Sequence, residues 1–123
     1  MGNYGFLKNS MDLSNFKKVI ARSKELGIYK IDTAFKYNLN EVFLDLIKEN
    51  FKIYTKIQLN KMSIKEIKTT VDKFIFNSNL DKIEGLYIHD PENLNKKEYI
   101  DKYFYLFDLK EKGKINKIGI SLN

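Results

Sequence analysis

Four short apolar stretches of this chain each carry a polar residue at or near their end, and the stretches recur at a nearly regular interval. They are 28–31 followed by Asp32, 51–57 with Lys56, 85–91 with His89 and 115–121 with Ser121. The polar residues are 24, 33 and 32 residues apart, close to the roughly 30 residues of a strand and its crossover helix. This spacing predicts parallel strands with all four polar residues at one edge of the sheet, where α/β folds carry their active sites.

The segments between these strands have the apolar spacing and the end signals of helices. Helices are expected over 15–26, 41–49, 64–76 and 97–112, and strands over 28–33, 51–57, 85–89 and 115–120. Ser63 and Glu66 have the spacing of a capping box, and Gly27 and Gly113 can take the left-handed position that ends a helix. Residues 1–10 read as a loop. The alternation predicts a single α/β domain over 1–123 with right-handed crossovers.

Two sets of residues are expected on particular faces of these elements. The face of the sheet turned away from the helices should carry Ile31, Tyr54, Ile88 and Ile118. The apolar face of the last helix should carry Tyr99, Tyr103, Leu106, Phe107 and Lys110.

Composition narrows the classes of partner. The chain has 123 residues and a net charge of +6, but the basic residues are spread along it and Arg22 is the only arginine, which disfavours a nucleic-acid interface. There is no cysteine, so disulfides and thiolate chemistry are excluded, and a reducing cytoplasm is the expected location. No apolar run approaches the roughly 20 residues of a membrane span, and the N-terminus lacks the regions of a signal peptide.

Each polar residue also has an ordinary structural explanation. Asp32 could cap a turn, Lys56 could be a solvated lysine at a strand end, and Tyr37 could pack in a loop. His89, the only histidine, could be a hydrogen-bonded core residue. Their regular spacing and shared edge favour a common site instead.

Four motifs, in order, carry a family resemblance. They are IDTAFKY at 31–37, YTK at 54–56, YIHDP at 87–91 and GKINKIGIS at 113–121. Together they resemble the aldo-keto reductases. The resemblance implies a (β/α)8 TIM barrel, of which this chain, at half of the usual length of about 250 residues, would form the N-terminal half: about four parallel strands with outer helices. It also implies NADP or NAD as cofactor and a small carbonyl or sugar substrate.

The resemblance assigns a role to each residue. Tyr37 would donate the proton, and the ammonium of Lys56 would lower the pKa of Tyr37. Asp32 would form an ion pair with Lys56 that keeps it charged and oriented, and His89 would orient the carbonyl oxygen. Ser121 would contact the nicotinamide amide, although Leu122 stands where the family commonly has asparagine.

Other readings stay open. The sequence shows no metal site and no glycine-rich phosphate loop. The chain could therefore be a truncated, non-catalytic half-barrel or a subunit that needs a partner chain. Nucleic-acid binding is a third class. Open sheet edges predict self-association, with weak or absent cofactor binding.

Overall fold

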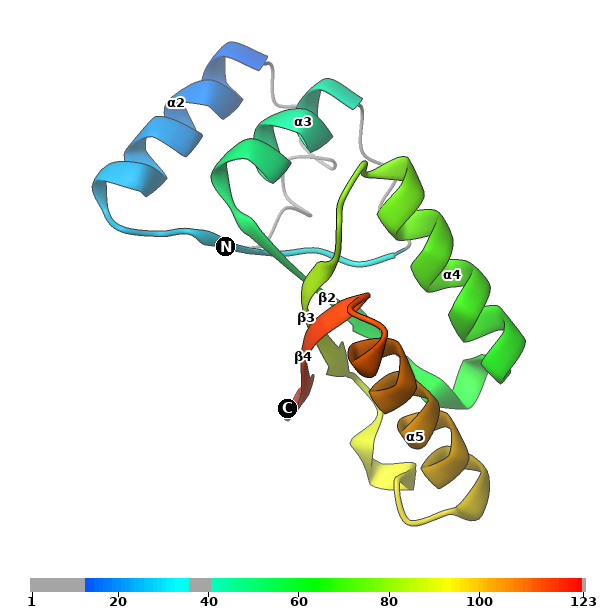
Figure 1. Ribbon diagram of the computed structural model, residues 1–123. Coiled ribbons are helices and arrows are strands. Elements are labelled where there is room, and N and C mark those ends of the chain that lie inside the picture. The colour runs from blue at the N-terminus through cyan, green and yellow to red at the C-terminus, as the bar shows by residue number, and fades with distance from the viewer. Residues whose placement is uncertain (1–12, 36–40, 123) are drawn as a thin grey trace.

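The computed structural model describes residues 13–35 and 41–122 and shows a partial TIM barrel, in which parallel strands alternate with helices (Figure 1). The strands are β1 (Lys30–Asp32), β2 (Lys52–Ile57), β3 (Ile83–Ile88) and β4 (Ile115–Ile120). The α-helices are α2 (Leu13–Glu25), α3 (Glu41–Asn50), α4 (Ile64–Asn77) and α5 (Lys97–Glu111), and the 3-10 helices are η1 (Leu59–Lys61) and η2 (Pro91–Asn93). The predicted fold class is confirmed.

The sheet has the order β1-β2-β3-β4, and every neighbouring pair is parallel. Consecutive strands are therefore neighbours, so all their carboxyl ends lie along one edge. β1 is shorter than the predicted 28–33, and among the described residues it pairs with β2. Backbone bonds from Lys52 to Tyr29 (2.8 Å) and from Thr33 to Tyr54 (2.8 Å) extend the pairing beyond both ends of β1. β3 begins at Ile83, two residues before the predicted start, because Ile83 pairs with Ile115.

The predicted helix ends are largely present. The Ser63 hydroxyl accepts from the Glu66 N–H at 3.1 Å, and the Glu66 carboxylate accepts from the Ser63 N–H at 3.1 Å, so the capping box at α4 is confirmed. Gly27 and Gly113 have φ of 72° and 77°, the left-handed conformation that glycine adopts at low cost. The first described helix differs, since it includes Leu13 rather than starting at residue 15.

Two apolar clusters fill the space between the sheet and its helices. One joins α2, α3 and the first two strands, and consists of Phe16, Ile20, Ile31, Ile47, Phe51 and Ile53. The other joins α4, α5, η1 and the last three strands, and includes Ile57, Leu59, Ile67, Val71, Leu86, Ile88, Leu106 and Leu109. In Figure 1, α2 and α3 lie together, while α4 and α5 lie along the other part of the sheet.

The predicted assignment of residues to the inner face of the sheet was wrong for three of four positions. Ile31 and Ile88 belong to the clusters on the helix side, and Ile118 packs against the second cluster. Side chains alternate between faces along a strand. Asp32 and Lys56 lie on the inner face of the sheet, which is turned away from the helices. Ile31, directly before Asp32, must therefore face the helices. Only Tyr54 of the predicted set lies on the inner face.

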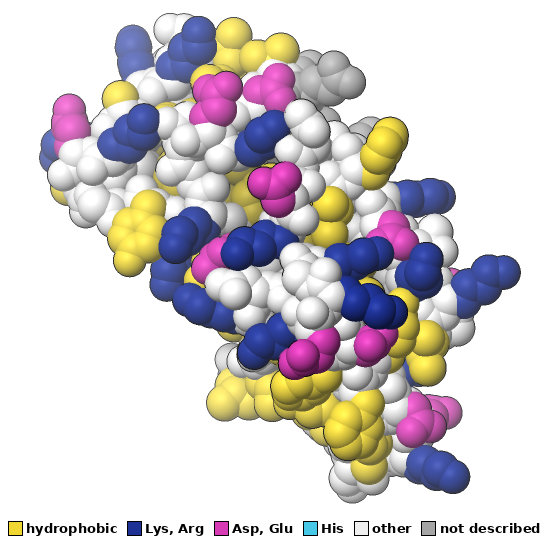
Figure 2. All heavy atoms as spheres, in the orientation of Figure 1, with side chains coloured by type: hydrophobic (Ala, Val, Ile, Leu, Met, Phe, Trp, Pro, Cys, Tyr) yellow, Lys and Arg dark blue, Asp and Glu magenta, His cyan; other side chains and the backbone are white. Residues whose placement is uncertain are grey.

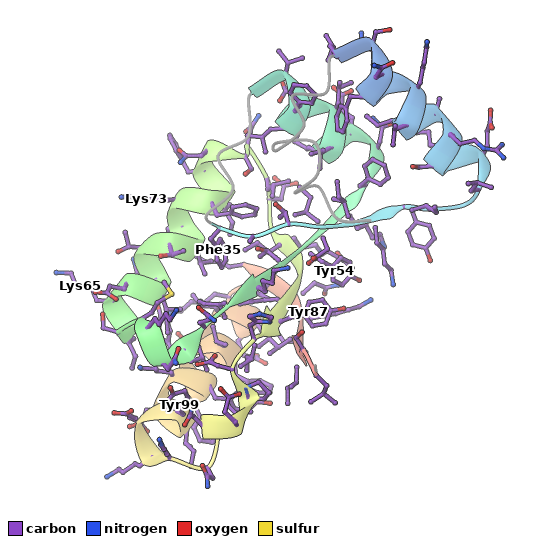
Figure 3. The ribbon with its side chains drawn as sticks, turned by 180° about the vertical axis from the view of Figure 1, so that it is seen from behind. Phe35, Tyr54, Lys65, Lys73, Tyr87 and Tyr99 are labelled. Atoms are coloured by element: carbon purple, nitrogen blue, oxygen red, sulfur yellow. The ribbon has the colours of Figure 1, made fainter. Side chains whose placement is uncertain are left out.

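Tyrosine and glycine shape the inner face. The rings of Tyr54 and Tyr87 stack, with centroids 6.0 Å apart and planes at 28°; Figure 3 shows them side by side, turned away from α4, whereas Phe35 points toward that helix. Gly85 lies beneath Tyr54, because a Cβ there would stand 2.2 Å from the ring. This face is therefore aromatic and polar rather than lined mainly by isoleucines, as the sequence predicted.

The buried face of α5 also differs from the prediction. Tyr99, Leu106 and Leu109 are buried, whereas Phe107 and Lys110 are exposed. Tyr99, Leu106 and Tyr103, which packs against the second cluster, confirm the predicted face, and only Phe107 and Lys110 were assigned to it wrongly. The helix also carries exposed apolar side chains such as Phe104 (64%), so the spacing of apolar residues alone does not select the buried side. Hydrophobic side chains gather at the lower end of the molecule, where α5 lies (Figure 2). No helix among residues 13–35 and 41–122 has the length and apolar character needed to cross a membrane.

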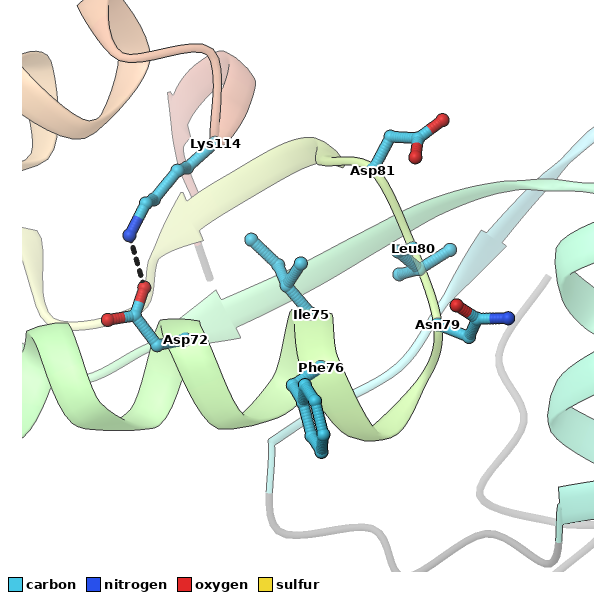
Figure 4. A pocket seen from close by; sticks show the side chains of 7 residues that line it. All are labelled: Asp72, Ile75, Phe76, Asn79, Leu80, Asp81 and Lys114. Carbon is cyan, nitrogen blue, oxygen red and sulfur yellow. Dashed lines mark hydrogen bonds and ion pairs between the residues drawn. The ribbon is translucent and has the colours of Figure 1, made fainter.

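A surface hollow lies at the amino ends of β3 and β4, opposite the edge that carries the predicted site residues. It is lined by Asp72, Ile75, Phe76, Asn79, Leu80, Asp81 and Lys114, and Figure 4 shows the ion pair between Lys114 and Asp72 within it. The Lys114 hydrogen bond, helped by Lys68 and opposed by partial burial, holds the pKa of Asp72 below its ordinary value of 3.8.

Replacing Gly85 with alanine should destabilise the fold. The added Cβ would overlap the ring of Tyr54, which is only 8% exposed and has little room to move, so we expect a loss of about 1–3 kcal/mol. Gly119→Ala is the control, because its Cβ would stand 3.0 Å from the more exposed ring of Tyr87. Urea unfolding of both variants checks this, and equal losses would contradict the packing argument.

Asp72→Asn should lower stability in a pH-dependent way. Because the folded-state pKa of Asp72 is lowered, its carboxylate stabilises the fold above the unfolded pKa, and this contribution is lost as pH falls through the folded value. We expect the variant to be less stable at pH 7 by up to about 1 kcal/mol, as befits a half-exposed pair. The difference should shrink below about pH 4. Denaturation at several pH values measures it, with the exposed Asp81→Asn as control.

Candidate active site

The best-defined part of the candidate site is an ion pair between two neighbouring strands. Asp32 is the last residue of β1 and pairs in register with Tyr54, so Lys56, two residues further along β2, lies on the same face. The Lys56 Nζ donates to Asp32 Oδ2 at 3.1 Å. This is the ion pair that the sequence predicted. The role of the pair in a reaction stays a prediction.

The solvent exposure of this ion pair limits its contribution to stability. The side chains of Lys56 and Asp32 are 29% and 44% exposed, and pairs that remain in contact with solvent contribute about 0–1 kcal/mol to stability. The pair therefore adds little to the fold. It does hold the Lys56 ammonium at a defined place on the open face of the sheet.

His89 follows β3 directly and continues its pairing with β2. Its N–H donates to the Ile57 carbonyl at 2.9 Å. Tyr87 pairs with Lys56, so His89, two residues further, lies on the same face as Lys56 and one step nearer the carboxyl edge. The Nδ1 of His89 is buried and has no hydrogen-bond partner within the part of the chain that the structure describes. Buried polar atoms are rarely left unpaired; the other such atom among the described residues is the Thr55 hydroxyl, which is fully buried.

Ser121 is placed by the next strand. It follows β4, and its N–H donates to the Ile88 carbonyl at 2.9 Å. The residue is half-buried. Asp32, Lys56, His89 and Ser121 therefore come from four successive strands and share one edge of the sheet.

Tyr37, the predicted proton donor, lies outside the described residues. Its predicted position near Lys56 and His89 stays a prediction.

Sequence reasoning missed one buried residue at this edge. Asp90 is 3% exposed, and its two carboxylate oxygens accept from the backbone N–H groups of Leu59 and Asn60, both at 2.8 Å. The signal was present in the motif HDP, since an aspartate directly after a strand commonly caps a loop. Its partners lie 31 and 30 residues away, and no local pattern reveals them.

Three surface hollows do not contain the candidate site residues. The hollow of Figure 4 lies at the amino ends of the strands. A second is lined by residues 60–65 and part of α5, and a third by residues of 48–53 and 79–84. None of the three includes Asp32, Lys56, His89 or Ser121. We place the candidate site by its side chains rather than by these hollows, because a barrel site is enclosed by loops from many strands.

A metal centre has no support in residues 13–35 and 41–122, where no group of three or more histidine or acidic residues is placed to hold an ion.

Comparison with known proteins shows both family and fold. The model of the aldo/keto reductase family matches residues 1–123. A Pseudomonas aeruginosa structure described as an aldo-keto reductase is 24% identical, with a TM-score of 0.80, over 98% of this chain and 53% of that one. An aldo/keto reductase from Brucella melitensis is 19% identical, with a TM-score of 0.67, over 91% of this chain and 46% of that one.

An aldo-keto reductase from Bacillus halodurans, solved in its apo form, is 25% identical, with a TM-score of 0.65, over 91% of this chain and 39% of that one. This chain thus spans about half the length of the solved structures that it matches, or less. No curated sequence matches it significantly. Because the family model matches residues 1–123, the chain belongs to the aldo/keto reductase family.

Proposed function

We propose that this chain carries the catalytic half of an NAD(P)H-dependent oxidoreductase that interconverts an aldehyde or ketone with an alcohol in the cytoplasm. The observation that carries the proposal is the Asp32–Lys56 ion pair at 3.1 Å, on the same edge as His89. Membership of the family supports it. A small carbonyl compound, including a sugar, is the substrate class.

The proposed reaction needs a proton donor that works near neutral pH. Reduction leaves negative charge on the carbonyl oxygen, and Tyr37 would supply the proton. A free tyrosine has a pKa of about 10, and a nearby ammonium favours the phenolate. Lys56 would provide that ammonium, and Asp32 would keep it charged and oriented.

His89 would position the substrate. Its imidazole lies on the same face as Lys56, and a nitrogen–hydrogen group there can donate to the carbonyl oxygen. Such a bond fixes the reacting carbon relative to the hydride donor and the acid. The buried Nδ1 without a described partner is consistent with an imidazole held for this purpose rather than for stability.

One described residue, Ser121, is suited to contact the carboxamide of a nicotinamide cofactor. The Ser121 hydroxyl can donate to and accept from a carboxamide, and it stands on the edge shared with His89. Leu122 is 83% exposed and offers no side-chain hydrogen bond. Bound NAD(P)H would supply the hydride. Phosphate sites in such barrels commonly come from the loops after strands seven and eight, and the part of the sheet that the structure describes has four strands.

A second candidate function is a non-catalytic half-barrel or a subunit that works with a partner chain. The observation that favours it is the sheet order, in which β1 and β4 each pair on one side only within the described residues. An unpaired strand edge exposes N–H and C=O groups that bind another strand. In the same proposal, residues 1–123 act as a single domain that self-associates.

Tyr37→Phe tests the catalytic reading. The change removes the acidic hydroxyl and keeps the ring, so in a barrel assembled to bind NADPH carbonyl reduction should fall at least about a hundredfold. Tyr29→Phe is the matched control, because Tyr29 is exposed before the amino end of β1. NADPH consumption with an excess of an aromatic aldehyde measures the rate. An unchanged rate in Tyr37→Phe would remove this residue from the mechanism.

Self-association has its own test. We expect light scattering after size-exclusion chromatography to show a dimer or larger species, and nicotinamide fluorescence to show weak or no NADPH binding. Ile120→Lys places a charge on the β4 edge and should shift the protein toward monomer. Phe76→Lys, on the exposed side of α4, is the control. A wild-type monomer that binds NADPH at micromolar affinity would refute the half-barrel reading.

A further inference from the structure

Asp90 is a buried charge that none of the roles above uses. It is 3% exposed and lies between His89 and Pro91. Burying a carboxylate is costly unless hydrogen bonds compensate for the lost water. Its two oxygens each accept one backbone N–H at 2.8 Å, from Leu59 and Asn60. Bonds to an ionised acceptor are roughly twice as strong as neutral ones.

These bonds join the segments that carry two candidate site residues. Leu59 begins η1, three residues after Lys56 on β2, and Asp90 follows His89 at the end of β3. The carboxylate therefore ties the loop after β2 to the loop after β3. The last described backbone bond between β2 and β3 runs from His89 to Ile57. Beyond that point, the described bonds between the two segments are those of the Asp90 carboxylate.

A second side chain holds the same peptide from the other side. The Nζ of Lys102, from α5, donates to the Leu59 carbonyl at 2.8 Å. Leu59 itself is fully buried in the second apolar cluster. Its N–H, its carbonyl and its side chain are thus all fixed, by Asp90, Lys102 and the core respectively.

We propose that Asp90 is a positioning residue, which sets the separation and orientation of Lys56 and His89 by clamping η1 to the end of β3. The inference rests on the proposed function, because Lys56 and His89 matter only if they take part in the reaction. The hydrogen bonds of Asp90 are present whether or not the chain is catalytic. A simple cap would stabilise η1 alone. A positioning residue must also move the side chains of Lys56 and His89 when it is changed.

The test is nuclear magnetic resonance of the full chain carrying Asp90→Asn. An amide can accept from only one of the two N–H groups and presents its own N–H₂ to the other. We expect hydrogen exchange at Leu59 and Asn60 to speed up roughly tenfold or more. The imidazole signals of His89, which are unambiguous because it is the only histidine, and the side-chain signals of Lys56 should shift.

Asp72→Asn is the matched control. It makes the same carboxylate-to-amide change at the opposite end of the sheet and should leave the signals of His89 and Lys56 in place. Faster exchange at Leu59 with unmoved His89 and Lys56 signals would overturn the proposal and leave Asp90 as a loop cap. So would equal shifts in both variants.

If Asp90→Asn does not fold, Lys102→Met decides. It removes the bond to the Leu59 carbonyl and the contact of the ammonium with the Tyr99 ring, and the same His89 and Lys56 signals should move, by a smaller amount. Signals that stay in place would refute the clamp. Because these readouts need no turnover, an inactive chain would count against the proposed function and not against the role of Asp90.

Discussion

The parallel register of the sheet is the constraint on which the rest of this molecule depends. Each strand pairs with the next strand in the sequence, so four segments deliver their carboxyl ends to one edge. Asp32, Lys56, His89 and Ser121 share this edge because each lies within the last two residues of its strand or directly after it. The candidate site is thus a product of connectivity, and no single segment contains it.

The apolar clusters and the candidate site residues occupy different parts of this sheet. The two apolar clusters lie on its helix side, and the Asp72–Lys114 pair lies at its amino ends. The inner face carries stacked tyrosines, a lysine–aspartate pair and a histidine whose Nδ1 has no partner among the described residues. The Asp32–Lys56 pair is partly exposed and adds little to the free energy of folding, and a buried nitrogen without a partner costs free energy.

Much of the fold could be predicted from sequence because its signals are local. The capping box at Ser63 and the left-handed glycines at 27 and 113 each depend on a few neighbouring residues. Fold class followed from the strand spacing, and the motifs around Asp32 and Lys56 indicated their pairing. The inner face was misassigned because alternation gives two equivalent choices, and only the partner strand selects one. Asp90 was missed because its partners lie about one βα unit away.

The Asp90 contact has a consequence for how such proteins can diverge. A fold built from repeated βα units could diverge by exchange of single units between related proteins. Here the βα unit that contains Lys56 is held by the Asp90 carboxylate, which belongs to the next βα unit. A recombinant that imported residues 51–80 with a differently shaped loop after β2 would keep its lysine but lose its anchor. An exchange that keeps this contact must therefore include two consecutive βα units rather than one.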